Sequence, residues 1–123
     1  MRTKWGGFGK ETFGTEPDYP WDDWNCVLRH KHNNKWYALV AEISERKLGL
    51  SSDRIIDVLN VKCDPLLIGS LRLKPGFFPA YHMNKLHWIS VLLPDAPDDV
   101  VQFLVNVSFE ATKSPKKKLK QPK

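Results

Sequence analysis

Residues 74–93 read KPGFFPAYHMNKLHWISVLL, and this stretch decides the fold. It begins with a Lys-Pro-Gly turn, because proline fixes φ and glycine accepts a positive φ without steric cost. From Lys85 the pattern predicts a strand through Leu93. One face would present Leu86, Trp88, Ser90 and Leu92, and the other His87, Ile89, Val91 and Leu93. Since both faces are largely apolar, we expect a central strand covered by helices on at least one face.

A polar corner, Tyr81 to Asn84, directly precedes this buried strand. Loops that are held by rigid elements often contain binding residues, so this corner is a candidate site. A purely structural role is the alternative, in which Tyr81 and His82 close the corner through hydrogen bonds to the backbone.

Three further strands are predicted upstream of this stretch. Residues 24–30 and 36–43 would pair as a hairpin, because residues 32–35 (His-Asn-Asn-Lys) have the composition of a hairpin turn. Alternation in the second of these strands would place Trp36, Ala38 and Val40 on one face and Tyr37, Leu39, Ala41 and Ile43 on the other. Residues 55–63 form the third strand.

Two helices complete the predicted fold. Asp64 suits an N-cap and Pro65 the first helical position, which predicts a short helix that ends before Pro75. The last helix starts within residues 95–99, and its apolar face would contain Val100, Phe103, Leu104, Val107 and Ala111. Strands joined by hairpins, with helices gathered on one face, predict an α+β two-layer sandwich whose antiparallel sheet is backed by helices.

The charge of the chain is unevenly distributed. The 123 residues have a formal net charge of +5, but six lysines fall within residues 113–123. We therefore expect one domain over residues 1–112, with nearly balanced charge, and a disordered lysine-rich tail over 113–123. Within the domain, residues 24–41 and 65–94 contain cations and all four histidines but no acid. If these two segments are neighbours, one side of the domain is basic.

Neither a metal site nor a catalytic site is predicted. The four histidines and two cysteines show no CxxC or HxxxH spacing, and no glycine-rich phosphate loop is present. A nucleophilic site of Cys63 with His82 or His87 is conceivable, but the position of Cys63 at the end of an apolar strand favours a packed thiol. We expect a non-enzymatic protein without cofactor. Cys26 and Cys63 would be free thiols, which is typical of the reducing cytoplasm.

Three motifs resemble those of the MmcQ/YjbR family of small bacterial proteins: PAYHMNKLHWISVLL at 79–93, NVKCDP at 60–65 and Ser-Phe-Glu at 108–110. The resemblance covers about residues 15–113 and implies a frataxin-like antiparallel sheet backed by helices. It also implies DNA binding through two wing-like loops, which would correspond to residues 30–35 and 81–85. The family usually has tyrosine where this chain has Phe109, so no role of that hydroxyl is carried over.

Double-stranded DNA is therefore the predicted partner. The expected contacts are Arg29, Lys31, Lys35, Lys74, His82, Asn84, Lys85 and His87, which supply cations and hydrogen-bonding groups for phosphates or bases. The alternative is a module that binds a protein or a small ligand in an apolar pocket lined by Phe77, Phe78, Tyr81 and Trp88.

The start of the chain departs from the family resemblance, which implies an amphipathic N-terminal helix. Residues 5–9 read WGGFG, and each glycine costs about 1 kcal/mol relative to alanine inside a helix. Residues 1–9 are accordingly expected to resist helix formation, and we interpret them as foreign sequence or the product of an altered reading frame.

Overall fold

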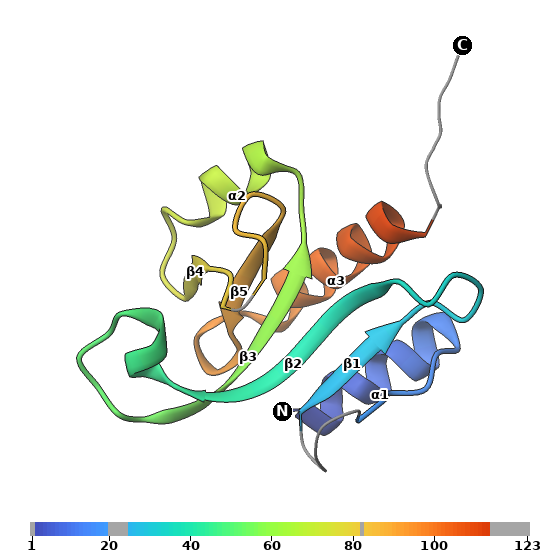
Figure 1. The fold of residues 1–123 in the computed structure, drawn as a ribbon, viewed down its shortest axis with the longest axis horizontal. Helices are drawn as coiled ribbons and strands as arrows, with labels where there is room; N and C mark the ends of the chain where they lie inside the picture. Colours follow the sequence, from blue (N-terminus) through green and yellow to red (C-terminus); the bar gives the residue numbers. More distant parts are fainter. Residues whose placement is uncertain (1, 20–24, 82, 114–123) are drawn as a thin grey trace.

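The computed structural model describes residues 2–19, 25–81 and 83–113. Their elements are α1 (Arg2–Phe13), β1 (Cys26–Arg29), β2 (Trp36–Ser44), a 3₁₀ turn (Glu45–Leu48), β3 (Ile55–Lys62), α2 (Pro65–Leu71), β4 (Phe77–Pro79), β5 (Trp88–Leu92), a second 3₁₀ turn (Leu93–Asp95) and α3 (Asp98–Thr112). The five strands form one antiparallel sheet in the order β1-β2-β3-β5-β4 (Figure 1). This arrangement confirms the predicted α+β class.

The two faces of the sheet have different surroundings. Helices α1 and α3 cover one face, which we call the helix face; α1 contacts β1 and β2, and α3 contacts β2 and β3. Figure 1 looks onto the opposite side, the open face, with both helices behind the strands. The main core lies under the helices and includes Leu28, Val40, Leu59, Val61, Ile89, Val91, Val101, Leu104 and Val105.

A β-bulge in β2 changes which side chains reach each face. Leu28 pairs with Ala38, but the next residue, Arg29, pairs with Trp36, so Tyr37 is the extra residue of the bulge. Tyr37 therefore joins the core under the helices, and Trp36 lies on the open face with Leu39. The predicted faces of Trp36 and Tyr37 are consequently wrong, because strict alternation does not allow for an added residue.

The N-terminal glycines lie inside a regular helix, so the expectation that they resist helix formation is wrong. Trp5 is 2% exposed in the core, where burial of a large aromatic side chain offsets the low helix propensity of glycine. A Cβ at Gly9 would lie 2.6 Å from the Tyr37 hydroxyl, which is in turn 2.6 Å from the Thr15 hydroxyl. Gly9 thus permits close packing of α1 on the bulge.

The buried face of α3 agrees with the predicted one only in part: Leu104 is buried and Val100 and Val107 pack against the core, as predicted. Val101, Leu104, Val105, Ser108 and Thr112 are the buried positions, whereas Ala111 is exposed and Phe103 is 58% exposed. The prediction failed because it treated the polar Ser108 and Thr112 as solvent-facing. The Ser108 hydroxyl donates to the Tyr37 carbonyl (2.5 Å) and accepts from the Lys62 amide (2.8 Å), so it satisfies backbone groups of β2 and β3 beside the bulge.

Predictions that rest on a single cap or turn residue agree with the structure. The Asp64 side chain accepts from the Leu66 amide at 2.8 Å, which confirms the predicted N-cap of α2. Gly76 has φ of 87°, as the predicted turn requires. The strand expected at residues 85–93 is limited to β5, and the short strand β4 was not predicted at all. The tail prediction lies outside the described residues beyond Lys113.

Candidate nucleic-acid interface and ligand pocket

The first predicted loop, residues 30–35, is a tight hairpin turn that also closes the end of α3. The His30 amide donates to the Lys35 carbonyl (2.9 Å), and Asn34 adopts a positive φ of 62°. The Asn33 side-chain amide lies 3.1 Å from the carbonyls of both Thr112 and Lys113, and His32 Nε2 lies 2.7 Å from the Lys113 carbonyl. These contacts satisfy carbonyls that the last turn of a helix leaves without partners.

The imidazole of His30 is part of the core. It is 1% exposed, its Nε2 lies 2.8 Å from the Thr112 hydroxyl, and its ring centroid is 4.2 Å from that of Phe109. Burial, reinforced by the nearby His32, lowers the pKa of His30 below its usual value of 6.5. His30 therefore has a structural role as a neutral ring.

The cations around this loop are in different environments. Arg29 forms an ion pair with Asp18, at a shallow depression that Glu16 also lines. Lys31 and Lys35 are both exposed. Lys31 lines the same depression as Glu16, Asp18 and Arg29, so cations and carboxylates lie together at this end of the molecule.

The second predicted loop, residues 81–85, is closed largely by Asn84. Its side-chain oxygen accepts from the Leu86 amide (2.8 Å), and its carbonyl accepts from the amides of His87 (3.2 Å) and Trp88 (2.9 Å). Lys85 and His87 are exposed, and His82 lies outside the described residues. The alternative structural role was assigned to Tyr81 and His82, whereas Asn84 is the residue that closes the loop.

A cation that the sequence did not single out, Lys47, lies beside this second loop. Lys47 and Lys85 line one depression of about 200 Å³, together with Leu48, Pro79, Ala80 and Tyr81. None of these lining residues is acidic, and neither lysine forms an ion pair with any described residue. Lys47 was missed because it lies in a segment whose contact with β4 and the loop is long-range.

The other predicted site residues are scattered. Lys74 lines a separate depression with Asp95 and Pro97, near the start of α3. Phe77 belongs to the core under the helices, whereas Phe78 packs against Ile56, Val58 and Leu92 in a smaller cluster on the open face. The aromatic pocket predicted around Phe77, Phe78, Tyr81 and Trp88 is therefore not formed as a unit.

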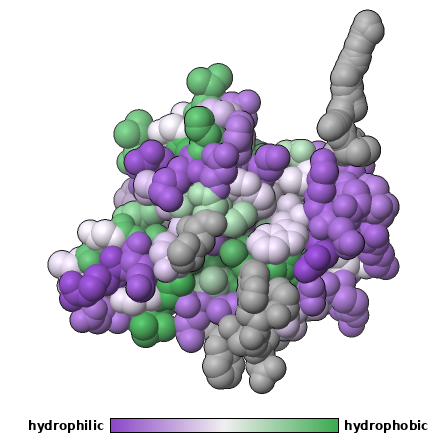
Figure 2. All heavy atoms as spheres, in the orientation of Figure 1, coloured by the Kyte–Doolittle hydropathy of each residue, from purple (hydrophilic) through white to green (hydrophobic). Residues whose placement is uncertain are grey.

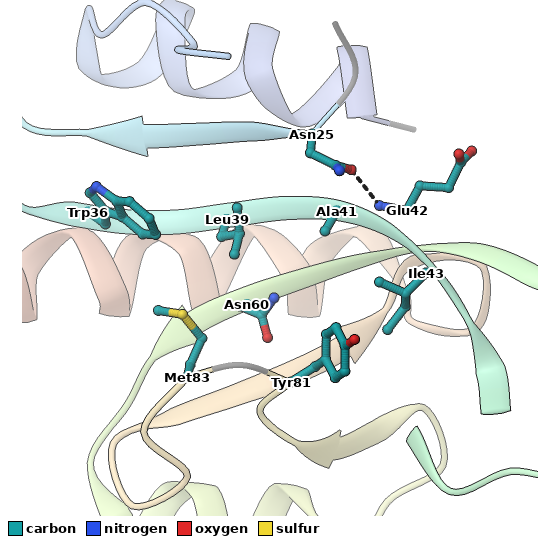
Figure 3. A pocket seen from close by; sticks show the side chains of 9 residues that line it. All are labelled: Asn25, Trp36, Leu39, Ala41, Glu42, Ile43, Asn60, Tyr81 and Met83. Carbon is teal, nitrogen blue, oxygen red and sulfur yellow. Dashed lines mark hydrogen bonds between the residues drawn. The ribbon is translucent and has the colours of Figure 1, made fainter. Parts of the chain in front are cut away.

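A hollow of about 380 Å³ lies on the open face, beside the second loop. Its lining residues are Asn25, Trp36, Leu39, Ala41, Glu42, Ile43, Asn60, Tyr81 and Met83 (Figure 3). Met83 of the second loop and Trp36, the residue after the first loop, both line the hollow, whereas His30, Lys31 and Asn34 of the first loop line a different depression. Figure 2 shows apolar atoms in the middle of this face, between hydrophilic groups at its two ends.

A buried polar chain forms part of the hollow's wall. The Tyr81 amide donates to the Ser90 hydroxyl (2.9 Å), which donates to the Asn60 side-chain oxygen (2.5 Å). Asn60 is 1% exposed, and its Nδ2 group has no hydrogen-bond acceptor among the described residues. An unsatisfied buried donor costs stability, and such groups deserve a functional explanation. A visible signal for Asn60 existed, since it interrupts the apolar run of β3.

The remaining candidate chemistry is limited. Burial raises the pKa of the Cys63 thiol to about 11, which disfavours the thiolate that a nucleophile requires. Cys26 and Cys63 are buried and do not form a disulfide, as predicted. In the described ranges, three or more His, Cys, Asp or Glu side chains do not gather as a metal site would require. None of the described helices has the length and hydrophobicity to cross a membrane.

Comparison with known proteins identifies close relatives. Residues 11–111 match the family model YjbR. The uncharacterized protein YyaQ of Bacillus subtilis is 43% identical over 107 residues, which cover 85% of this chain and 91% of that protein.

Solved structures have the same fold. A crystal structure of a Pseudomonas syringae protein has a TM-score of 0.86 and 42% identity, and covers 91% of this chain and 98% of its own. A solution NMR structure from the same organism has a TM-score of 0.82 and 39% identity, with 97% and 98% covered. A Deinococcus radiodurans protein, DR2400, shares the fold at 24% identity and a TM-score of 0.61, with 82% and 70% covered.

Proposed function

This chain belongs to the YjbR family, and we propose that it is a non-enzymatic protein that binds double-stranded DNA through the open face of its sheet. The observation that carries the proposal is the depression lined by Lys47 and Lys85 without any acidic side chain, next to the second loop. Phosphate contacts dominate the affinity of proteins for DNA, and exposed lysines supply them.

The contact set differs from the one expected from sequence. Arg29 is paired with Asp18, and Asn84 closes its own loop, so neither is assigned a phosphate. The proposed phosphate contacts are Lys31 and Lys35 at the first loop and Lys47 and Lys85 at the second. His87, two residues after Lys85, is exposed and supplies a further hydrogen-bonding group.

Fluorescence anisotropy with a labelled 20-base-pair duplex tests this proposal. For four phosphate contacts we expect log K to fall against log salt concentration with a slope of about −3.6. The variant K47Q/K85Q should reduce the magnitude of that slope by about 2. Lys74→Gln is the matched control, because Lys74 lies beside Asp95 in a separate depression, and it should leave the slope unchanged.

The lysine-rich end of the chain requires its own control. Lys116, Lys117, Lys118 and Lys120 are replaced together by glutamine in the full chain, which keeps its length. Binding that persists in this variant and depends on Lys47 and Lys85 supports the proposal. Loss of all binding with the tail charges, or a K47Q/K85Q slope equal to that of the parent protein, would refute it.

Small-ligand binding is the second candidate function, and one observation favours it. The hollow of about 380 Å³ falls within the range of roughly 300–1,000 Å³ that is typical of ligand sites. Its walls are largely apolar, with a few polar groups, as such sites usually are.

A further inference from the structure

The hollow on the open face has features that select among ligands, and we propose that it binds a flat, uncharged ring compound with a carbonyl group that accepts a hydrogen bond from Asn60. This inference rests on the second candidate function, small-ligand binding. It is independent of DNA binding and assigns the ligand class from the chemistry of the walls.

The direction of the hydrogen bonds around Asn60 sets the polarity of the ligand. The Ser90 hydroxyl accepts from the Tyr81 amide and has a single proton, which it donates to the Asn60 oxygen. Since the Asn60 oxygen accepts this bond, the Nδ2 amino group is the part of the side chain that is left to bind a ligand. Figure 3 shows this nitrogen on the side of the hollow. Because Nδ2 can only donate, the complementary ligand atom is an acceptor.

The described part of the lining offers no cationic partner for an anionic acceptor. Glu42 is the one charged residue that lines the hollow among those described, and no described lysine, arginine or histidine lines it. A carboxylate or phosphate in the hollow would lose hydration without gaining a cationic partner, which is costly in an apolar site. A carbonyl oxygen accepts the same hydrogen bond without that cost, so we infer a neutral ligand.

The side walls set the shape of the ligand. Trp36 and Tyr81 supply aromatic surfaces, Met83 supplies a polarizable side chain, and Leu39 and Ile43 supply aliphatic ones (Figure 3). Aromatic and methionine walls contact a flat ring well, because stacking and sulfur–ring contacts both add to the burial of apolar area. The position of Trp36 depends on the bulge at Tyr37, which turns its indole to this face.

A pair of matched probes tests the inference: oxindole, a flat lactam with a carbonyl, and indane, which has nearly the same shape and no acceptor. Titrations of the full chain are followed by ¹H–¹⁵N NMR, which reports on the side-chain amide of Asn60 directly. One added hydrogen bond in a buried site predicts a preference for oxindole of about tenfold. Oxindole should also shift the Asn60 side-chain signals, whereas indane should shift mainly the signals of the apolar walls.

Two variants make the test specific. Asn60→Leu removes the donor at similar size and should abolish the preference while indane still binds. Ala41→Phe fills the hollow and should abolish binding of both probes, and Ala111→Phe, on the exposed side of α3, is the matched control that should bind as the parent does.

The results distinguish a wrong role for Asn60 from the absence of a ligand site. Equal affinity for both probes in the parent protein overturns the role of Asn60 and leaves the ligand site standing. Absence of binding by either probe, or binding unaffected by Ala41→Phe, overturns the ligand site itself. If Asn60→Leu fails to fold, the probe preference and the Asn60 signals of the parent protein still decide the question.

Discussion

Buried polar side chains on the two faces of the sheet differ in how many of their hydrogen-bonding groups have partners. Under the helices, Ser108 bridges two strands, and His30 and Thr112 are 2.8 Å apart at the end of α3. On the open face, Asn60 is equally buried but half of its amide group has no partner among the described residues. A polar group with all its partners stabilises the fold, whereas a group that lacks one is suited to bind something else.

The two loops differ in the same way, since the polar side chains of one serve the fold and the other loop borders the hollow. The first loop has polar side chains that cap α3, so much of its composition is explained by folding. The second loop closes itself through Asn84 and borders the hollow through Tyr81 and Met83. Similar residue types at two corners therefore serve different purposes, and the difference can be tested by substitutions on each face.

The largest expected effect is at Ser108. Ser108→Ala leaves the Tyr37 carbonyl and the Lys62 amide without this partner in the core, at a cost of about 2–4 kcal/mol in the free energy of unfolding. Urea denaturation measures the loss. The control Ser70→Ala, at an exposed position of α2, should change stability by less than about 0.5 kcal/mol, and an equally small effect at Ser108 would contradict its bridging role.

A pair of glycine substitutions in α1 tests the close packing on the bulge. Gly9→Ala places a methyl group against the Tyr37 hydroxyl and should destabilise the protein by about 1–3 kcal/mol. Gly7→Ala meets no atom within 4 Å and should stabilise by up to about 1 kcal/mol through helix propensity. Thermal denaturation of both variants gives the comparison, and the same sign for both would argue against a packing role for Gly9.

The buried His30 predicts a dependence of stability on pH. Its pKa is lowered in the folded state, so below the unfolded value of 6.5 the unfolded chain binds more protons than the folded one. The stabilisation contributed by His30 is therefore complete above pH 6.5 and is lost as the pH falls from 6.5 toward the folded pKa.

Replacement of His30 by glutamine measures this contribution. Glutamine still reaches hydrogen-bonding distance of Thr112 but does not titrate, so the variant should lose about 1 kcal/mol at pH 7.5 and show a flatter profile between pH 7 and 5. Urea titrations at several pH values measure the profile. His87→Gln, at an exposed position, should keep the parent profile, and a parent-like slope in His30→Gln would rule out His30 as the cause.

The smallest expected effect on stability is at Asn60. Asn60→Leu removes an unsatisfied buried donor but leaves the buried Ser90 hydroxyl without its acceptor, so one unsatisfied group replaces another and stability should stay within about 1 kcal/mol of the parent. Urea denaturation provides the measurement. A loss above about 2 kcal/mol would mean that Asn60 serves the fold, as Ser108 does, and would remove the contrast between the faces.

Much of the fold could be predicted because its signals are local. The cap at Asp64, the turn at Gly76 and the alternation in β3 and β5 depend on neighbouring residues alone. The site was less accessible to prediction. His32 and Asn33 find their partners about 80 residues away, and the contact of Lys47 with the second loop also depends on tertiary packing.

Two errors have a common physical cause. The face of α3 was misassigned in part because Ser108 and Thr112 are polar yet buried, since each hydroxyl has backbone or side-chain partners. The faces of Trp36 and Tyr37 were exchanged because two adjacent aromatic residues give no hint of which one is extra. In both places hydrophobic periodicity alone mispredicts the face, because α3 buries hydroxyl groups and β2 contains an added residue.

The bulge at Tyr37 has a consequence for how relatives of this chain should be aligned. The added residue shifts the alternation of side chains in β2 by one position. The alignment positions whose side chains face the hollow therefore change at that point. A homologue with one residue fewer between its hairpin and the equivalent of Ala38 would present a different column to the hollow, even if every neighbouring column were identical. Gap placement at this single position therefore determines which residues can be compared when ligand preference is traced across the family.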